Sequence, residues 1–147
     1  MKRTLALTAL LTIAAWAGAL TLQVGSPDAN PEAKSLNAAL VADVTACHEP
    51  AKSTVTASYI QMTQSGVHRT DLQVKQLKAT GKFAVIGTIP PGAVIELTVT
   101  NPQFGNYQPR VLLRTDTRGI EWASIKHFYS TPPSDADVKA ALEASID

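Results

Sequence analysis

An uncharged apolar block at the N-terminus constrains this chain more than any other feature. Lys2 and Arg3 precede it, and residues 4–24 carry no charge. A helix over this block would be about 32 Å long, close to the ~30 Å hydrocarbon core of a bilayer. We therefore predict that residues 1–24 form a membrane anchor helix or a signal segment, which contacts the lipid bilayer through residues 4–24. The predicted membrane-contacting side chains are Leu5, Leu10, Ile13, Trp16, Leu20 and Leu22.

The same block also fits a cleaved signal peptide. It has a basic start, an apolar centre, and small residues two positions apart in Ala15-Trp16-Ala17 and Ala17-Gly18-Ala19. In both cases the N-terminus is expected in the cytoplasm and the following domain in the periplasm or outside the cell. A membrane location is favoured because the apolar character continues past both cleavage sites. The alternative is secretion after cleavage near Ala17 or Ala19.

The rest of the chain predicts an all-β domain. Residues 25–35 contain two prolines and a glycine, which predicts a flexible linker, and residues 36–147 are the expected folded domain. Residues 33–46 suit either a short helix or an extended segment. Short alternating stretches with frequent turn signals then favour a small antiparallel β-sandwich of the Ig-like type. Strands are expected at residues 53–62, 72–77, 82–89, 93–100, 110–116 and 120–129.

Particular side chains are assigned to the core and to the last helix. Ile95, Leu97 and Val99 alternate with polar residues and should share the buried face of one strand. Trp122 and Phe128 are expected to anchor the core. Ser134 precedes a short apolar stripe, which predicts the N-cap of a C-terminal helix.

Composition excludes several functional classes. The chain has a single cysteine, so neither an internal disulfide framework nor a cysteine-rich zinc module is possible. Its net charge of +1 does not favour nucleic-acid binding. Sequence motifs for phosphate-binding loops, zinc proteases and serine hydrolases are absent, and only three histidines are present for acid–base chemistry. We predict a protein that is not an enzyme and needs no cofactor.

Cys47 and His48 are the weak candidates for a metal site. A thiol beside an imidazole offers two ligands for a soft metal such as copper or zinc. Adjacent side chains point apart in a strand, however, and the complete ligand set of a known metal motif is missing. A lone, partly buried thiol with no metal is the preferred interpretation.

A basic strand and an aromatic loop supply the predicted protein contacts. Arg110, Arg114 and Arg118 would share one face if this segment were a regular strand. Phe104 and Tyr107 lie in a preceding loop rich in Gly, Asn and Pro, where they would form an exposed tip or tuck back onto the domain.

These features together predict a non-catalytic, membrane-tethered extracytoplasmic interaction subunit of a larger membrane or envelope complex. Its partners would be other protein subunits. One alternative is a secreted β-sandwich that binds a ligand or assembles into a surface fibre by strand addition. Another is a periplasmic metal-binding protein that uses Cys47 and His48.

Overall fold

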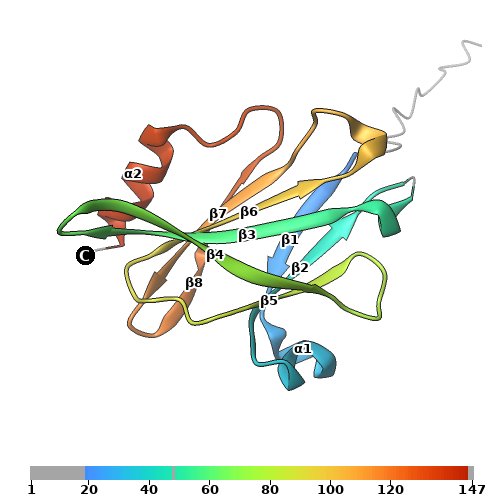
Figure 1. The fold of residues 1–147 in the computed structure, drawn as a ribbon, viewed down its shortest axis with the longest axis horizontal. Helices are drawn as coiled ribbons and strands as arrows, with labels where there is room; N and C mark the ends of the chain where they lie inside the picture. The colour runs from blue at the N-terminus through green and yellow to red at the C-terminus, as the bar shows by residue number, and fades with distance from the viewer. Residues whose placement is uncertain (1–18, 48, 146–147) are drawn as a thin grey trace, which may run out of the picture.

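The computed structural model describes residues 19–47 and 49–145, which form one curled antiparallel sheet with short helices on its outer surface (Figure 1). The two α-helices are α1 (Pro31–Ser35) and α2 (Asp135–Ala144), and the 3-10 helices are η1 (Pro27–Ala29), η2 (Pro50–Lys52) and η3 (Pro102–Phe104). The strands are β1 (Thr21–Gly25), β2 (Ala38–Thr45), β3 (Thr54–Thr63), β4 (Gly66–Gln76), β5 (Lys82–Ile86), β6 (Val94–Thr100), β7 (Arg110–Asp116) and β8 (Gly119–Phe128).

The strand order is β1-β2-β5-β4-β3-β6-β7-β8, and every neighbouring pair is antiparallel. β4 joins the two halves of this sheet. Its residues 66–72 pair with β3, whereas its residues Gln73–Gln76 pair with β5. The sheet thus turns over along β4 and becomes nearly barrel-like, with the main core inside the curl.

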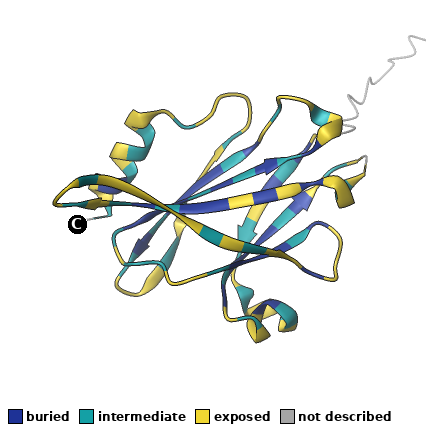
Figure 2. Ribbon diagram, in the orientation of Figure 1, coloured by how far each residue is buried: buried dark blue, intermediate teal, exposed yellow. Residues whose placement is uncertain are grey.

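The inner face of the sheet supplies the main core. Ile95, Leu97 and Val99 of β6 are fully buried there, which confirms the alternation read from the sequence. Side chains from the other half, such as Leu40 and Val85, pack against them. Figure 2 shows this burial running along the strands, with exposed positions at the turns and on α2. Antiparallel strands with one face on a core require this alternation.

Each α-helix covers a patch of the outer face. Ala33 of α1 packs with Val41 and Ala84, while Leu142 of α2 packs with Ile60 and Val94. The predicted N-cap of the last helix is confirmed. Ser134 Oγ accepts a hydrogen bond from Asp137 N, and Asp137 Oδ2 accepts one from Ser134 N, which completes a capping box.

Leu20 and Leu22 belong to the folded domain and not to a membrane helix. They are 0% and 1% exposed in the main core, and Leu22 lies in β1, paired with Val44 of β2. The prediction of one apolar helix through residue 24 is therefore wrong for residues 20–24. Apolar side chains are stable in a protein core as well as in the lipid of a bilayer. Residues 1–18, with Leu5, Leu10, Ile13 and Trp16, lie outside the described part of the chain.

Among the described helices, none has both the length and the apolarity required to cross a membrane.

The predicted linker at residues 25–35 is also wrong, because most of it forms η1 and α1. Asn30 Oδ1 accepts a hydrogen bond from Ala33 N and caps α1, and Ala33 is fully buried. Of the two alternatives for residues 33–46, the helix is wrong beyond Ser35, the last residue of α1, and the extended segment is confirmed as β2 (Ala38–Thr45). Asn37 has a positive φ of 51°, which reverses the chain and lets β2 begin at Ala38. Proline and asparagine here build a tight turn-and-cap structure.

The structure confirms the antiparallel all-β character and the short C-terminal helix, but it does not show an Ig-like sandwich.

Trp122 is 38% exposed and is not a core anchor. The reason is an irregularity in β8. Opposite Leu112 and Arg114 the register shifts between Lys126 and Glu121, so the strand bulges and its alternation fails.

Candidate interaction surface

Phe104 and Tyr107 do not form an exposed tip. Both are partly buried and pack against the main core. The loop is held by Asn101, a buried residue whose Oδ1 accepts a hydrogen bond from Gln103 N and whose Nδ2 donates to Ser53 Oγ at 3.0 Å. The two rings therefore contribute to stability and present little surface to a partner.

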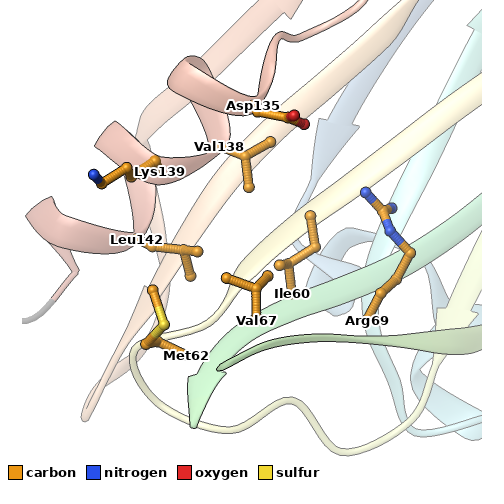
Figure 3. Close-up of a pocket in the computed structure, with 8 residues that line it drawn as sticks. All are labelled: Ile60, Met62, Val67, Arg69, Asp135, Val138, Lys139 and Leu142. Carbon is orange, nitrogen blue, oxygen red and sulfur yellow. The ribbon is translucent and has the colours of Figure 1, made fainter. Parts of the chain in front are cut away.

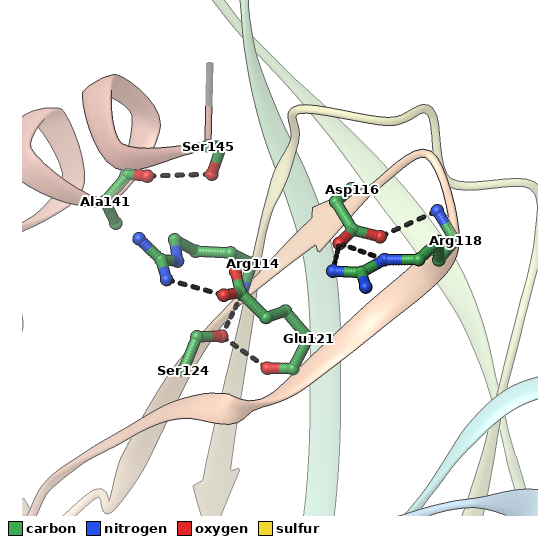
Figure 4. Close-up of polar contacts among 7 residues, drawn as sticks. All are labelled: Arg114, Asp116, Arg118, Glu121, Ser124, Ala141 and Ser145. Atoms are coloured by element: carbon green, nitrogen blue, oxygen red, sulfur yellow. Dashed lines mark hydrogen bonds and ion pairs between the residues drawn. The ribbon is translucent and has the colours of Figure 1, made fainter. Parts of the chain in front are cut away.

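The three predicted arginines each meet a carboxylate. Arg118 Nη2 lies 2.9 Å from Asp116 Oδ2, and this pairing lowers the pKa of Asp116 and raises that of Arg118. Arg114 Nη2 lies 2.9 Å from Glu121 Oε1 across the bulge (Figure 4). These ion pairs neutralise much of the expected basic face.

Arg110 is the first residue of β7 and lies at the opposite end of the strand from Arg118. Its Nη1 lies 3.9 Å from Glu96 Oε1, which also receives Arg69 at 3.2 Å. Arg118 follows the far end of β7, about 20 Å away at the rise of an extended strand. Arg110 and Arg114 lie on the same face of β7 as Leu112, opposite the buried Val111 and Leu113, whereas Phe104 and Tyr107 pack against the main core.

Cys47 is exposed just after β2, and His48 lies outside the described residues. Within residues 19–47 and 49–145, no three His, Cys, Asp or Glu side chains come together as metal ligands would. The predicted metal pair includes His48, so it lies partly outside the described part of the chain.

The tip of the β3–β4 hairpin has an unexpected distribution of apolar side chains. Along β3 the inner residues Val55 and Ala57 pack in the main core, as alternation requires. Farther along, the outer positions Ile60 and Met62 are apolar and the intervening Gln61 is polar. β6 pairs with β3 only as far as Ile60, so the tip projects beyond the sheet and has no core behind it.

Val67 extends the apolar outer face onto β4. It pairs directly with Met62, so both side chains lie on the same face. Ile60 is covered by α2 and is 2% exposed, but Met62 and Val67 remain 50% and 58% exposed. The sequence thus places more apolar surface on this face than α2 covers.

A groove of about 360 Å³ separates this face from α2 (Figure 3). We call it the hairpin–helix groove. On the helix, its residues recur at three- and four-residue spacing and so form one stripe. The lining residues are Ile60, Met62, Val67 and Arg69 from the hairpin and Asp135, Val138, Lys139 and Leu142 from α2.

The charged groups at the rim are largely engaged by other side chains. Arg69 Nη1 donates to Ser58 Oγ at 2.6 Å and to Glu96 Oε1 at 3.2 Å, so its guanidinium is held over the sheet. Lys139 lies 3.8 Å from Glu143 on the exposed side of α2. The interior of the groove is therefore apolar.

Sequence reasoning missed this groove. The signal was the spacing of Ile60, Met62 and Val67 around the turn at Gln64-Ser65, which forms a hairpin. Only the position of α2 shows that these side chains line a groove.

Comparison of the chain with protein-family models, curated proteins and solved structures finds no match.

Proposed function

We propose that this chain is an exported, non-catalytic interaction domain that docks a partner protein at the hairpin–helix groove. The observation that carries the proposal is the pair of half-exposed apolar residues, Met62 and Val67, beside an apolar groove. Methionine is enriched at protein interfaces because its flexible side chain adapts to different partners.

The open form of the groove favours a protein partner over a small molecule. Small-molecule sites usually enclose most of the ligand surface. Here the two apolar residues on the hairpin stay open to solvent, and the volume equals about a dozen water molecules. That space suits one or two aliphatic side chains projecting from a larger partner.

The start of β1 supports export followed by cleavage. With Leu20 in the main core, an anchor helix would have only residues 4–19, and its length would be about 24 Å. This is shorter than the ~30 Å hydrocarbon core of a bilayer. Cleavage near Ala17 or Ala19 would leave β1 intact, so we favour a secreted or periplasmic domain over a tethered subunit.

The groove can be tested with the neutral fluorescent probe 1-aminoanthracene. Val67→Asp should weaken probe binding about tenfold or more, because a carboxylate in an apolar site loses solvation without gaining a partner. Thr70→Asp is the matched control, since Thr70 is exposed on the same strand but lies outside the groove. Equal probe binding by both variants and the parent would contradict the proposal.

The export step can be tested by intact mass of the protein recovered from a host that expresses the full chain. We expect the mature chain to begin near residue 18 or 20. A mature chain that retains Met1 and fractionates with membranes would support the tethered subunit instead.

A further inference from the structure

Among residues 19–47 and 49–145, no strand pairs with the edge of β4 that lies beside the groove. β3 pairs with residues 66–72 on one side of β4, and β5 occupies the other side only along Gln73–Gln76. Within the described residues, no strand continues β5 alongside Val67–Asp71. This stretch is exposed at every position. A strand could therefore be added in line with β5.

The backbone polar groups of Val67, Arg69 and Asp71 point to this open edge. The two-residue turn Gln64-Ser65 joins Thr63 to Gly66, so Gly66 bonds toward β3 and its odd-numbered neighbours point away. The hydrogen bonding at the other end of β4 agrees with this orientation. Leu77 N donates to Lys82 O at 2.8 Å, which shows that odd-numbered residues face the β5 side. No register shift interrupts β4.

The outermost strand β8 offers a poorer template than β4. It is interrupted by its bulge, where Ser124 Oγ accepts a hydrogen bond from Arg114 N and donates one to Glu121 O (Figure 4). A bulge is one of the devices that protect natural sheet edges. The Val67–Asp71 edge has neither a bulge nor a proline.

We propose that the Val67–Asp71 edge of β4 is a strand-addition site for an extended segment of a partner protein. Backbone hydrogen bonds to β4 would supply affinity, and apolar side chains on the outer face of the added strand would contact Val67 beside the hairpin–helix groove. This inference rests on the proposed function and specifies how the partner binds.

A peptide copying Lys82–Ile86, Lys-Phe-Ala-Val-Ile, is the appropriate probe. This sequence already pairs antiparallel with β4 on the same edge, so it can adopt the required geometry. Titrated into the folded protein, it should shift the amide resonances of Val67, Arg69 and Asp71 and slow their hydrogen exchange about tenfold at saturation. The amides of His68 and Thr70, which bond to β3, should change little. The same peptide with proline at its third position should bind much more weakly.

Two variants at one position separate backbone pairing from side-chain effects. Asp71→Pro removes only an outward N–H, which edge strands tolerate, and should abolish the protection at Val67 and Arg69 while the chain stays folded. Asp71→Asn keeps the N–H and should bind as the parent does. Peptide-induced shifts at β1 or β8, or none at millimolar peptide, would overturn the inference.

These outcomes are distinguishable from failure of the proposed function. If Val67→Asp loses 1-aminoanthracene binding but the peptide protects no β4 amide, the proposed function at the groove is retained and strand addition to β4 is wrong. If the probe does not distinguish Val67→Asp from Thr70→Asp, the proposed function itself fails.

Discussion

Gly81 is the residue whose replacement should be least tolerated for backbone reasons. Its φ is +78°, and a Cβ there would overlap the carbonyl oxygen of Val44. The same loop bonds to β2, since Val44 N donates to Gly81 O at 2.7 Å. Glycine is thus required both by its conformation and by the close approach of two backbones.

We predict that Gly81→Ala lowers the free energy of unfolding by about 3 kcal/mol or more, measured by urea denaturation. Gly92→Ala is the matched control. Its φ of +77° is nearly the same, but a Cβ would meet only Ser145 O at an ordinary 3.9 Å. That variant should lose about 1 kcal/mol from conformation alone. Equal losses would show that the contact with Val44 is unimportant.

At the scale of elements, α2 depends on a carboxylate with a shifted pKa. Hydrogen bonds from the Ser134 side chain and backbone, together with Lys126, lower the pKa of Asp137 to about 2. Asp137 Oδ1 lies 3.0 Å from Lys126 Nζ, which ties α2 to β8. The helix is therefore held at its N-terminus by ionised Asp137, and over the sheet by Leu142.

We predict that Asp137→Asn lowers the midpoint of thermal unfolding at neutral pH and that this difference disappears at acidic pH. Because the folded-state pKa lies below the unfolded value of 3.8, the stabilisation is present above about pH 4 and is lost as the pH falls toward 2. Asp135→Asn, in the same first turn, is the control and should show a smaller difference. A difference that persists unchanged at pH 2 would show that the charge of Asp137 does not stabilise the helix.

At the scale of the whole molecule, the N-terminal boundary decides which residues belong to the fold. β1 pairs with β2 along its full length, and Leu22 fills the main core beneath it. A chain shortened past β1 would expose β2 and open that core.

We predict that Leu22→Ala lowers the free energy of unfolding by about 2–4 kcal/mol, because it leaves a cavity in a packed core. Gln23→Ala, at the exposed neighbouring position, should change it by less than about 0.5 kcal/mol. Chemical denaturation of the exported protein provides the measurement. If Leu22→Ala were as mild as its control, β1 would not be an integral part of the fold.

The sequence was most informative where one residue pattern has one structural solution. Alternation around Ile95, Leu97 and Val99 predicted a half-buried strand, and Ser134 predicted a helix start, because both signals are local. It was ambiguous for residues 20–24. Leu20, Leu22 and Val24 alternate with Thr21 and Gln23, which is a strand pattern, but the preceding apolar residues made the segment resemble part of a membrane helix.

The sequence by itself determined the β-rich class, most strands and the last helix, because side-chain periodicity is set by local backbone geometry. Tertiary structure alone decided that β4 links two halves of one curled sheet and that its edge is open beside Val67. It also decided that the predicted contact arginines are paired with carboxylates and that α2 leaves Met62 uncovered. These properties depend on which distant segments meet, and strand pairing across a sheet is not encoded in the period of any one strand.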